Sequence, residues 1–336
     1  MTALGVFLFY IIPAFLLGEV LRCVYLEHRG DRIPILLYHR LISRKEVEAG
    51  RIPDREPIYV SYDDSFDAQM RDLRDHGFTT LSLDDFLAIR RGESVRPAKP
   101  VVVTFDDGYE SNHALAWPVL HRYGMKATIF VAPQPDDYTR NLVAGIDGFL
   151  SADQMRDMDR GGVAIESHTL THCVLTDLDD AAARHELVES KRRLSEILGR
   201  PVRHLAVPRS GHSHRIRRLA RQAGYLTVCA NGKGSSNGWS SLYALPRIVV
   251  ERDTTPEDLD RALRPAGAVI LRLVGNLKRI PTLLFGSVRT QKMRRALYSS
   301  PLGGLFLTRC LVRVLAGWAL LYAVGIALFT WHLMSR

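Results

Sequence analysis

Residues 101–108 read Val-Val-Val-Thr-Phe-Asp-Asp-Gly: an uncharged run, then two adjacent carboxylates and a glycine. The β-branched and aromatic residues favour a strand that is buried on both faces. Two charges at the end of such a strand are costly unless something binds them, and a cation is the simplest partner. The stretch therefore predicts a buried parallel strand that is followed by two functional carboxylates, Asp106 and Asp107. A plain Asp-Gly turn is the alternative.

On both sides of this stretch, residues 33–263 alternate short β-rich runs with amphipathic helical stretches, which is typical of parallel strands joined by crossover helices. Ser151 with Gln154 resembles a capping box, and Thr255 followed by Pro256 marks a second helix start. A long amphipathic helix is predicted over Arg184–Leu198. The predicted strands are Ile35–Tyr38, Thr79–Leu81, Val101–Phe105, Ala127–Val131, Val163–Glu166, His204–Val207, Leu226–Cys229 and Ile248–Val250.

Functional groups follow four of these strands. His39 comes after the first, the Asp pair after the third, and His168 and Pro208 follow two later strands. In a (β/α) barrel the chemistry gathers at the rim where the strands end. This placement favours a barrel over an open doubly wound sheet.

The segment 166–172, Glu-Ser-His-Thr-Leu-Thr-His, spaces His168 and His172 so that both can reach one metal from a single turn. Taken alone, this spacing is a weak signal. Two His with a carboxylate such as Asp107 form a catalytic zinc set that leaves a position open for water. We therefore predict a divalent metal of zinc type as the cofactor.

Together, Thr104–Gly108 and Ser167–His172 resemble the motifs of the polysaccharide deacetylases of carbohydrate esterase family 4, the NodB-homology domain. The resemblance implies an α/β fold, a distorted (β/α)7 barrel, over residues 31–264. It also implies hydrolysis of an N-acyl group, with Asp106 as the general base and with Asp107, His168 and His172 as the metal ligands. Further matching segments are Ile33–His39, Lys126–Val131 and Leu245–Ile248.

The chain departs from this family pattern in the acid that protonates the leaving amine. Family members often take a His from a late Leu-x-His motif, but the corresponding segment here, Val269–Leu273, has none. A branch of the family with an early Tyr-His uses that His instead, so the resemblance implies His39 as the catalytic acid. A structural role for His39 is the alternative.

A second departure affects the group that orients the base. The family's third motif has an Arg before the Pro, whereas this chain has Ala206-Val207-Pro208-Arg209; the early Tyr-His branch also has Ala there. Arg247 is predicted to supply the missing charge near Asp106, and Arg209 to meet an anionic group of the substrate. Tyr109 and Trp239 are predicted to stack on sugar rings. Ordinary surface or core roles remain open for all four.

Two long apolar stretches predict transmembrane helices over residues 1–24 and 314–334. Residues 265–313 mix apolar blocks with Lys and Arg, as amphipathic segments on an anionic lipid surface do. Because these basic residues flank the apolar stretches on the side of the domain, the positive-inside rule predicts two spans in the inner (plasma) membrane and a cytoplasmic catalytic domain. A core helix and a basic linker without contacts are the alternatives.

The net charge of +9 is concentrated near the carboxyl end, where residues 265–336 hold ten Lys and Arg and no Asp or Glu. The remaining chain is nearly neutral, which argues against a nucleic-acid partner. Its four cysteines form no C-x-x-C pair.

The sequence thus predicts a membrane-anchored, metal-dependent deacetylase of an acylated amino sugar, in a lipid-linked glycan precursor or a polysaccharide, with membrane lipids as partners of the basic tail. The alternatives are a non-catalytic glycan- or glycolipid-binding membrane protein that retains the fold, an exported glycan deacetylase, and a cytoplasmic amidase of small molecules. Acetate release that is lost on Asp106→Asn would separate enzyme from binder.

Overall fold

The computed structural model describes residues 12–51, 59–210, 213–230 and 234–277. The chain forms two compact units, Met1–Leu273 and Val274–Arg336. The whole sheet and the helices around it belong to the first unit. Of the second unit, only the last residues of helix α12 (Pro265–Leu277) are described.

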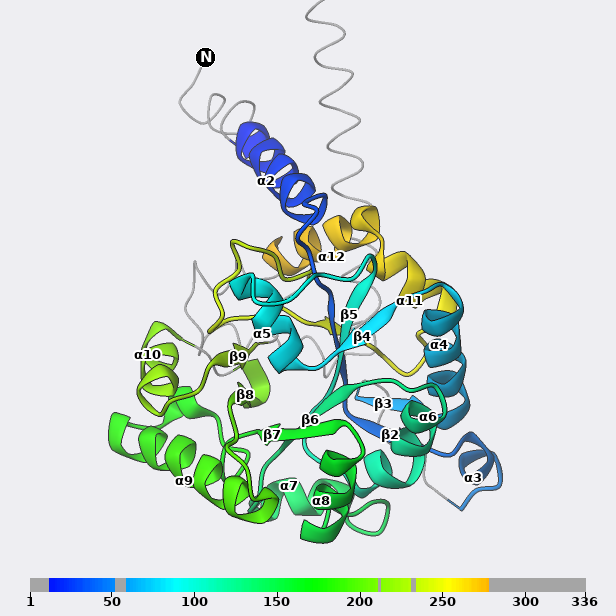
Figure 1. Ribbon diagram of the computed structural model, residues 1–336, viewed down its shortest axis with the longest axis vertical. Helices are drawn as coiled ribbons and strands as arrows, with labels where there is room; N and C mark the ends of the chain where they lie inside the picture. Colours follow the sequence, from blue (N-terminus) through cyan, green and yellow to red (C-terminus); the bar gives the residue numbers. More distant parts are fainter. Residues whose placement is uncertain (1–11, 52–58, 211–212, 231–233, 278–336) are drawn as a thin grey trace, which may run out of the picture. The chain divides into compact units, whose positions relative to one another are not determined.

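A parallel sheet of eight strands lies at the centre of the first unit (Figure 1). Its order is β10-β1-β5-β6-β7-β8-β9, and β4 pairs with β5. Cys229 of β9 bridges Leu245, and Ile248 pairs with Leu36 of β1, so the stretch around Leu245 links the two edges of the sheet into a barrel-like arrangement. The strands are β1 (Ile35–Tyr38), β4 (Thr79–Leu81), β5 (Pro100–Phe105), β6 (Ala127–Val131), β7 (Val163–Ser167), β8 (His204–Ala206), β9 (Thr227–Cys229) and β10 (Ile248–Val249).

All eight predicted strands are confirmed, each within one residue of the predicted bounds. Two further strands were not predicted: β2 (Arg40–Ile42) and β3 (Val60–Tyr62), which pair in parallel as a separate sheet. Arg40 and Ser61 stand among their apolar residues, so no apolar run marks these two short strands.

The connecting helices lie around the strands, as Figure 1 shows. Both predicted starts are confirmed, because Ser151 with Gln154 and Thr255 with Asp258 form complete capping boxes. The long helix α9 begins at Asp180, four residues before the prediction, because Asp179 caps the N–H of Ala182. The helices are α3 (Arg44–Glu48), α4 (Asp63–Asp75), α5 (Leu83–Arg91), α6 (Trp117–Arg122), α7 (Asp137–Val143), α8 (Ala152–Arg160), α9 (Asp180–Leu198), α10 (His214–Gln222) and α11 (Pro256–Leu263).

The core has two parts, because successive residues of a strand face opposite sides. Leu36, Val103 and Ile129 pack outward against the helices in the larger cluster. Their neighbours along the strands, among them Ile35 and Val102, form a smaller cluster enclosed by the sheet; its other strand residues are Leu81, Phe130, Ala206 and Cys229. The strands β1, β5 and β6 are buried along their whole length, as strands covered on both faces should be.

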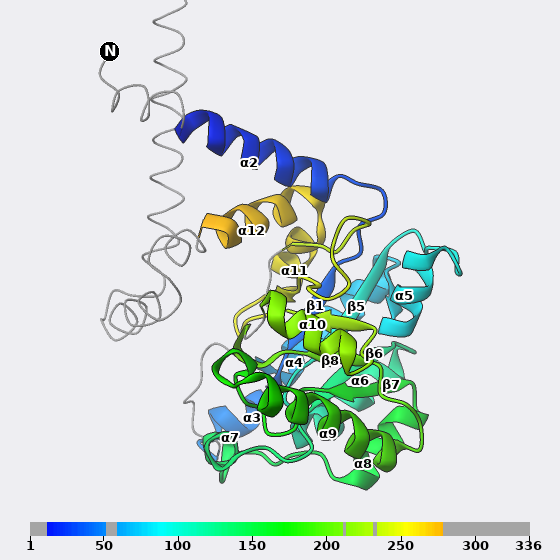
Figure 2. The ribbon, with the colours of Figure 1, turned by 90° about the vertical axis from the view of Figure 1, so that its left-hand side faces the viewer.

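The predicted membrane topology is corrected by the structure. Its described residues contain no helix that is both long and apolar enough to cross a bilayer, so the prediction of an inner-membrane protein with two spans is wrong. Helix α2 (Ile12–Glu27) has 16 residues and includes Glu19 and Arg22, which form an ion pair. Residues 1–11, 278–313 and the predicted second span at 314–334 lie outside the described residues. Figure 2 shows α2 beside α12, where Arg272 donates to Glu27 at 2.6 Å.

Candidate active site

Successive side chains of a strand point to opposite faces of the sheet, and this alternation determines which polar side chains lie close together. In β5, Val102 faces the enclosed cluster, so Thr104 and Asp106 share its side. Asp106 follows the last residue of β5, and His39 and His168 follow the last residues of β1 and β7. Because all these strands are parallel, their carboxyl ends meet at one rim.

Asp107, His168 and His172 form a compact donor set at this rim. Asp107 Oδ1 lies 3.3 Å from His168 Nε2 and 3.1 Å from His172 Nε2. One ligand atom from each residue can be chosen so that all three lie within 4.8 Å of one another. Asp107 and His168 are buried, and the side chain of His172 is only 11% exposed.

The second nitrogen of each imidazole is held by a neighbour. His168 Nδ1 lies 2.9 Å from the carbonyl oxygen of Ala206, which only accepts, so in the neutral ring Nδ1 carries the proton and Nε2 presents its lone pair. His172 Nδ1 pairs with Thr139 Oγ1 at 3.1 Å. A hydrogen bond to the second ring nitrogen orients a metal-ligating His residue. One carboxylate and two such imidazoles fit a divalent metal of zinc type.

Charges shift the pKa values in this cluster. Burial alone would raise the pKa of Asp107, but the hydrogen bonds from His168 and His172 outweigh it and hold that pKa well below its usual value. Burial alone would lower the pKa of His168, but the charges of Asp106 and Asp107 outweigh it and raise the pKa. The cluster therefore attracts positive charge.

The Asp107-Gly108 turn places the carboxylate close to β6. Asp107 and Gly108 have φ of 75° and 71°, both in the left-handed region. A Cβ on Gly108 would lie 2.8 Å from Cγ2 of Val131, so only glycine permits this approach.

Asp106 is paired with a buried arginine. Arg247 Nη1 and Nη2 donate to Asp106 Oδ1 and Oδ2 at 2.6 and 2.7 Å, and both side chains are almost fully buried. Burial opposes ionisation of Asp106, but the charge of Arg247 outweighs it and lowers the pKa of the carboxyl. Asp106 Oδ2 lies 3.9 Å from His168 Nε2, so this carboxylate borders the donor set.

His39 is partly buried, and its Nδ1 atom is buried without a hydrogen-bond partner among the described residues. Burial lowers its pKa, although Asp107 and Asp106 act in the opposite direction. Tyr59, whose surface is 53% exposed, lies against the His39 ring with the centroids 4.7 Å apart. Burial thus favours the neutral ring, whereas the charges of Asp107 and Asp106 favour the protonated form.

Three other predicted site residues, Tyr109, Pro208 and Arg209, lie in different surroundings from one another. Tyr109 is buried and stacks on Phe149 at 5.5 Å, so its ring face already has a partner. Pro208 is buried, and exposed Arg209 lies over the ring of Tyr138 at 5.0 Å.

Trp239, which was predicted to stack on a sugar ring, lies near the amino end of β1 and not beside the donor set. Ser236 bridges Ile33 just before β1, and the Trp239 ring contacts Tyr25 and lies 5.2 Å from the guanidinium of Arg29. His39 and the aspartates stand at the carboxyl ends of their strands.

Two residues that support the site were not predicted. Glu186 is buried on α9 and accepts from the backbone N–H groups of Leu170 and Thr171 and from the Thr171 hydroxyl, which fixes the loop between the two His. In the sequence, Glu186 could have been found as a carboxylate on the apolar side of a helix. Thr139, which orients His172, gave no local signal.

Comparisons with known proteins agree with this geometry. The family model described as Polysaccharide deacetylase matches residues 93–228. The Bacillus subtilis (strain 168) protein named "Putative polysaccharide deacetylase YxkH" is 29% identical over 219 residues, which are 65% of this chain and 71% of that protein.

Solved structures resemble the fold. The Streptococcus pyogenes deacetylase PplD in complex with acetate has a TM-score of 0.61 at 24% identity, covering 70% of this chain and 99% of PplD. IcaB from Ammonifex degensii has a TM-score of 0.57 at 20% identity, covering 72% of this chain and 98% of IcaB.

Proposed function

Because this chain carries a polysaccharide deacetylase domain of the NodB type and is a hydrolase of carbon–nitrogen bonds other than peptide bonds, we propose that it removes the N-acetyl group of an amino sugar with the help of a divalent metal. One observation supports this most: a donor set of Asp107, His168 and His172 beside a second carboxylate, Asp106, that Arg247 keeps ionised.

Asp107, His168 and His172 are the proposed ligands of the metal. A divalent ion of zinc type bound there would polarise the acyl oxygen and lower the pKa of water to about 7. Asp107 supplies the negative charge, and the two imidazoles supply Nε2 lone pairs that Ala206 and Thr139 orient.

Asp106 is the proposed general base, and His39 the proposed acid. Asp106 accepts a proton from the attacking water at a carboxylate oxygen, and its bidentate pair with Arg247 keeps it ionised for this purpose. Water forms the new bond to the acyl carbon, the C–N bond breaks, and His39 donates a proton to the departing amine. The charges of Asp107 and Asp106 favour the protonated form of His39, which supports this role.

The proposed substrate is an acylated amino-sugar glycan. The lipid-linked precursor was predicted from a cytoplasmic membrane placement, and that placement has been corrected. Polysaccharide is the substrate class that the matched family model names. The non-catalytic alternative rested on the missing late His and the altered third motif, and the contact of Arg247 with Asp106 offers the charge that this motif lacks.

Acetate release tests this proposal. The full chain is incubated with oligomers of N-acetylglucosamine, and acetate and free amine are measured with and without a chelator. Asp106→Asn is expected to lower turnover at least about 100-fold, because general-base catalysis contributes that much or more. Asp153→Asn is the matched control, since its side chain is 86% exposed on α8. Equal rates in wild type and Asp106→Asn would reject the proposal.

A second variant tests the proposed acid. His39→Gln is expected to keep the metal content of wild type, measured by elemental analysis, while turnover is lost. His185→Gln, at an exposed position of α9, is the control. Unchanged turnover in His39→Gln would exclude His39 as the acid.

A further inference from the structure

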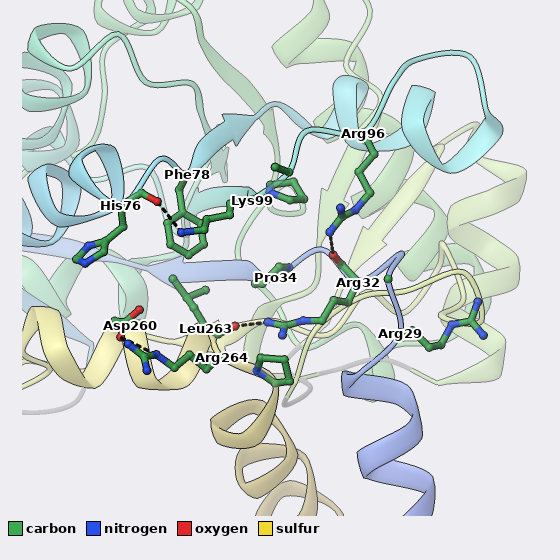
Figure 3. A pocket seen from close by; sticks show the side chains of 14 residues that line it. Arg29, Arg32, Pro34, His76, Phe78, Arg96, Lys99, Asp260, Leu263 and Arg264 are labelled. Atoms are coloured by element: carbon green, nitrogen blue, oxygen red, sulfur yellow. Dashed lines mark hydrogen bonds and ion pairs between the residues drawn. The ribbon is translucent and has the colours of Figure 1, made fainter.

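A cavity of about 530 Å³ lies at the end of the sheet opposite the candidate active site. Pro34, just before β1, and Pro100, the first residue of β5, line it, whereas the catalytic groups follow the last residues of these strands. Figure 3 shows its walls, which come from the α2–β1 connection, the segment before β5, and the junction of α11 and α12.

The cavity is strongly basic. Five cationic side chains line it against one carboxylate, Asp260. Two of the five are neutralised, because Arg264 pairs with Asp260 and Arg29 pairs with Asp31 through both oxygens. The other three are Arg32, Arg96 and Lys99.

These three cations hydrogen-bond mainly to backbone carbonyl groups. Arg96 Nη2 donates to the carbonyl of Arg32 at 2.9 Å, and Arg32 Nη2 donates to that of Leu263. Lys99 Nζ donates to the carbonyl of His76 at 2.9 Å. Figure 3 shows these contacts as dashed lines.

Carboxylates compensate these charges poorly. Glu27 Oε2 lies 4.0 Å from Arg32 Nε, too far for a hydrogen bond, while Glu27 Oε1 accepts from Arg272 at 2.6 Å. The Nε atoms of Arg32 and Arg96 are buried without a hydrogen-bond partner among the described residues, and the Arg32 side chain is only 11% exposed. Two guanidinium groups held near one another with little water repel, which an anion between them would relieve.

We propose that this cavity binds a multiply charged oxyanion of the phosphate class, either inorganic phosphate or the phosphate group of a sugar phosphate. Guanidinium groups match the tetrahedral oxygens of phosphate, and an ammonium adds a point charge. A single carboxylate would leave most of the positive charge uncompensated. The bound anion would tie Arg32 to Arg96 and Lys99, and hence the α2–β1 connection to the segment before β5, at a distance from the deacetylation site.

Thermal unfolding of the full chain tests the site. Inorganic phosphate is expected to raise the melting temperature in a saturable way, whereas potassium chloride at matched ionic strength is not, because simple salt only screens the charges. Glucose 6-phosphate and glucose form the second pair of probes. Equal saturation by both phosphates assigns the site to the phosphate group alone, and tighter binding of glucose 6-phosphate assigns it to a sugar phosphate.

Three variants locate the effect. Lys99→Ala and Arg96→Gln are each expected to weaken phosphate binding about tenfold, the loss typical of one charge-assisted contact. Arg160→Ala, whose side chain is 76% exposed on α8, should respond like wild type. Lys99 is exposed, so its replacement tests the site even if Arg96→Gln folds poorly. The proposal is overturned if potassium chloride matches phosphate, or if Lys99→Ala responds like wild type.

Discussion

Three residues of the candidate site have left-handed backbone conformations that non-glycine residues seldom adopt. Asp107, Thr169 and His172 have φ of 75°, 65° and 66°. Such a conformation costs about 1–2 kcal/mol per residue and persists only where the surroundings enforce it. Glu186 provides part of that enforcement, since it accepts two backbone N–H groups of the loop between Thr169 and His172. The strain is therefore concentrated where the carboxylate and the imidazoles converge.

Gly108→Ala should disturb this site. The added Cβ would lie 2.8 Å from Val131, so β6 or the Asp107 turn must move. Gly92→Ala is the matched control, because Gly92 also has a positive φ, of 75°, but has open space around it. We expect Gly108→Ala to lower the free energy of unfolding in urea by about 1–3 kcal/mol more than Gly92→Ala, and to weaken metal binding. Equal losses in the two variants would show that the contact with Val131 does not matter.

Arg247→Lys should shift the pH dependence of the reaction. A lysine cannot form the bidentate pair with Asp106, so the pKa of Asp106, now lowered by Arg247, is expected to rise. Asp106 must be ionised to accept a proton, and the rate falls as the pH drops through its pKa. The acid limb of kcat/KM against pH should therefore move to higher pH, with at least about a tenfold loss of rate at pH 6. Arg122→Lys, with a side chain 58% exposed, is the control. An unmoved acid limb would contradict this role of Arg247.

At the scale of single residues, the sequence predicts those site residues that belong to a recognisable local motif. Asp107, His168 and His172 lie within five residues of the end of a strand, and the structure brings them together. The sequence did not predict at which end of the sheet Trp239 lies, because a Gly/Ser-rich loop does not reveal which end it covers. Glu186 was missed because its contact with the His loop depends on how α9 packs.

At the scale of elements, the helix starts and main-sheet strands that were predicted from capping and strand patterns occur in the structure. The eight strands of the main sheet were predictable because runs such as Val101–Phe105 are apolar and bounded by turn residues. The small β2–β3 sheet was not, because polar Arg40 and Ser61 stand within its two short strands and no apolar run marks them. Helix starts with a capping box were predictable because the box itself is local.

Removal of one cap should therefore have a measurable and separable effect. Ser151 Oγ accepts from the Gln154 N–H at 3.2 Å, and Gln154 Oε1 accepts from the Ser151 N–H at 2.8 Å. Ser151→Ala is expected to lower the free energy of unfolding by about 1 kcal/mol, measured in urea, without changing KM. Ser94→Ala, in the exposed segment before β5, is the control and should change stability little. A loss in Ser151→Ala no larger than in Ser94→Ala would show that the cap contributes nothing.

At the scale of the first unit, the parallel sheet separates two kinds of chemistry. The carboxylates and imidazoles of the candidate active site gather at the carboxyl ends of the strands, whereas Arg32, Arg96 and Lys99 gather at the amino ends. Composition alone did not predict this separation, because Arg32, Arg96 and Lys99 belong to a part of the chain that is nearly neutral overall. Only the fold brings them to one cavity.

A metal at the candidate site would connect β5 to β7 and so stabilise the whole unit. Because a ligand that binds only the folded state adds to its stability, chelation should lower the melting temperature of the full chain by roughly 5–10 °C, and added zinc should restore it. His172→Ala removes one ligand and should make the melting temperature insensitive to chelator. His185→Ala, at an exposed position of α9, should respond like wild type. A chelator effect of the same size in His172→Ala would place the metal elsewhere, because the two remaining ligands, Asp107 and His168, could not hold it as tightly.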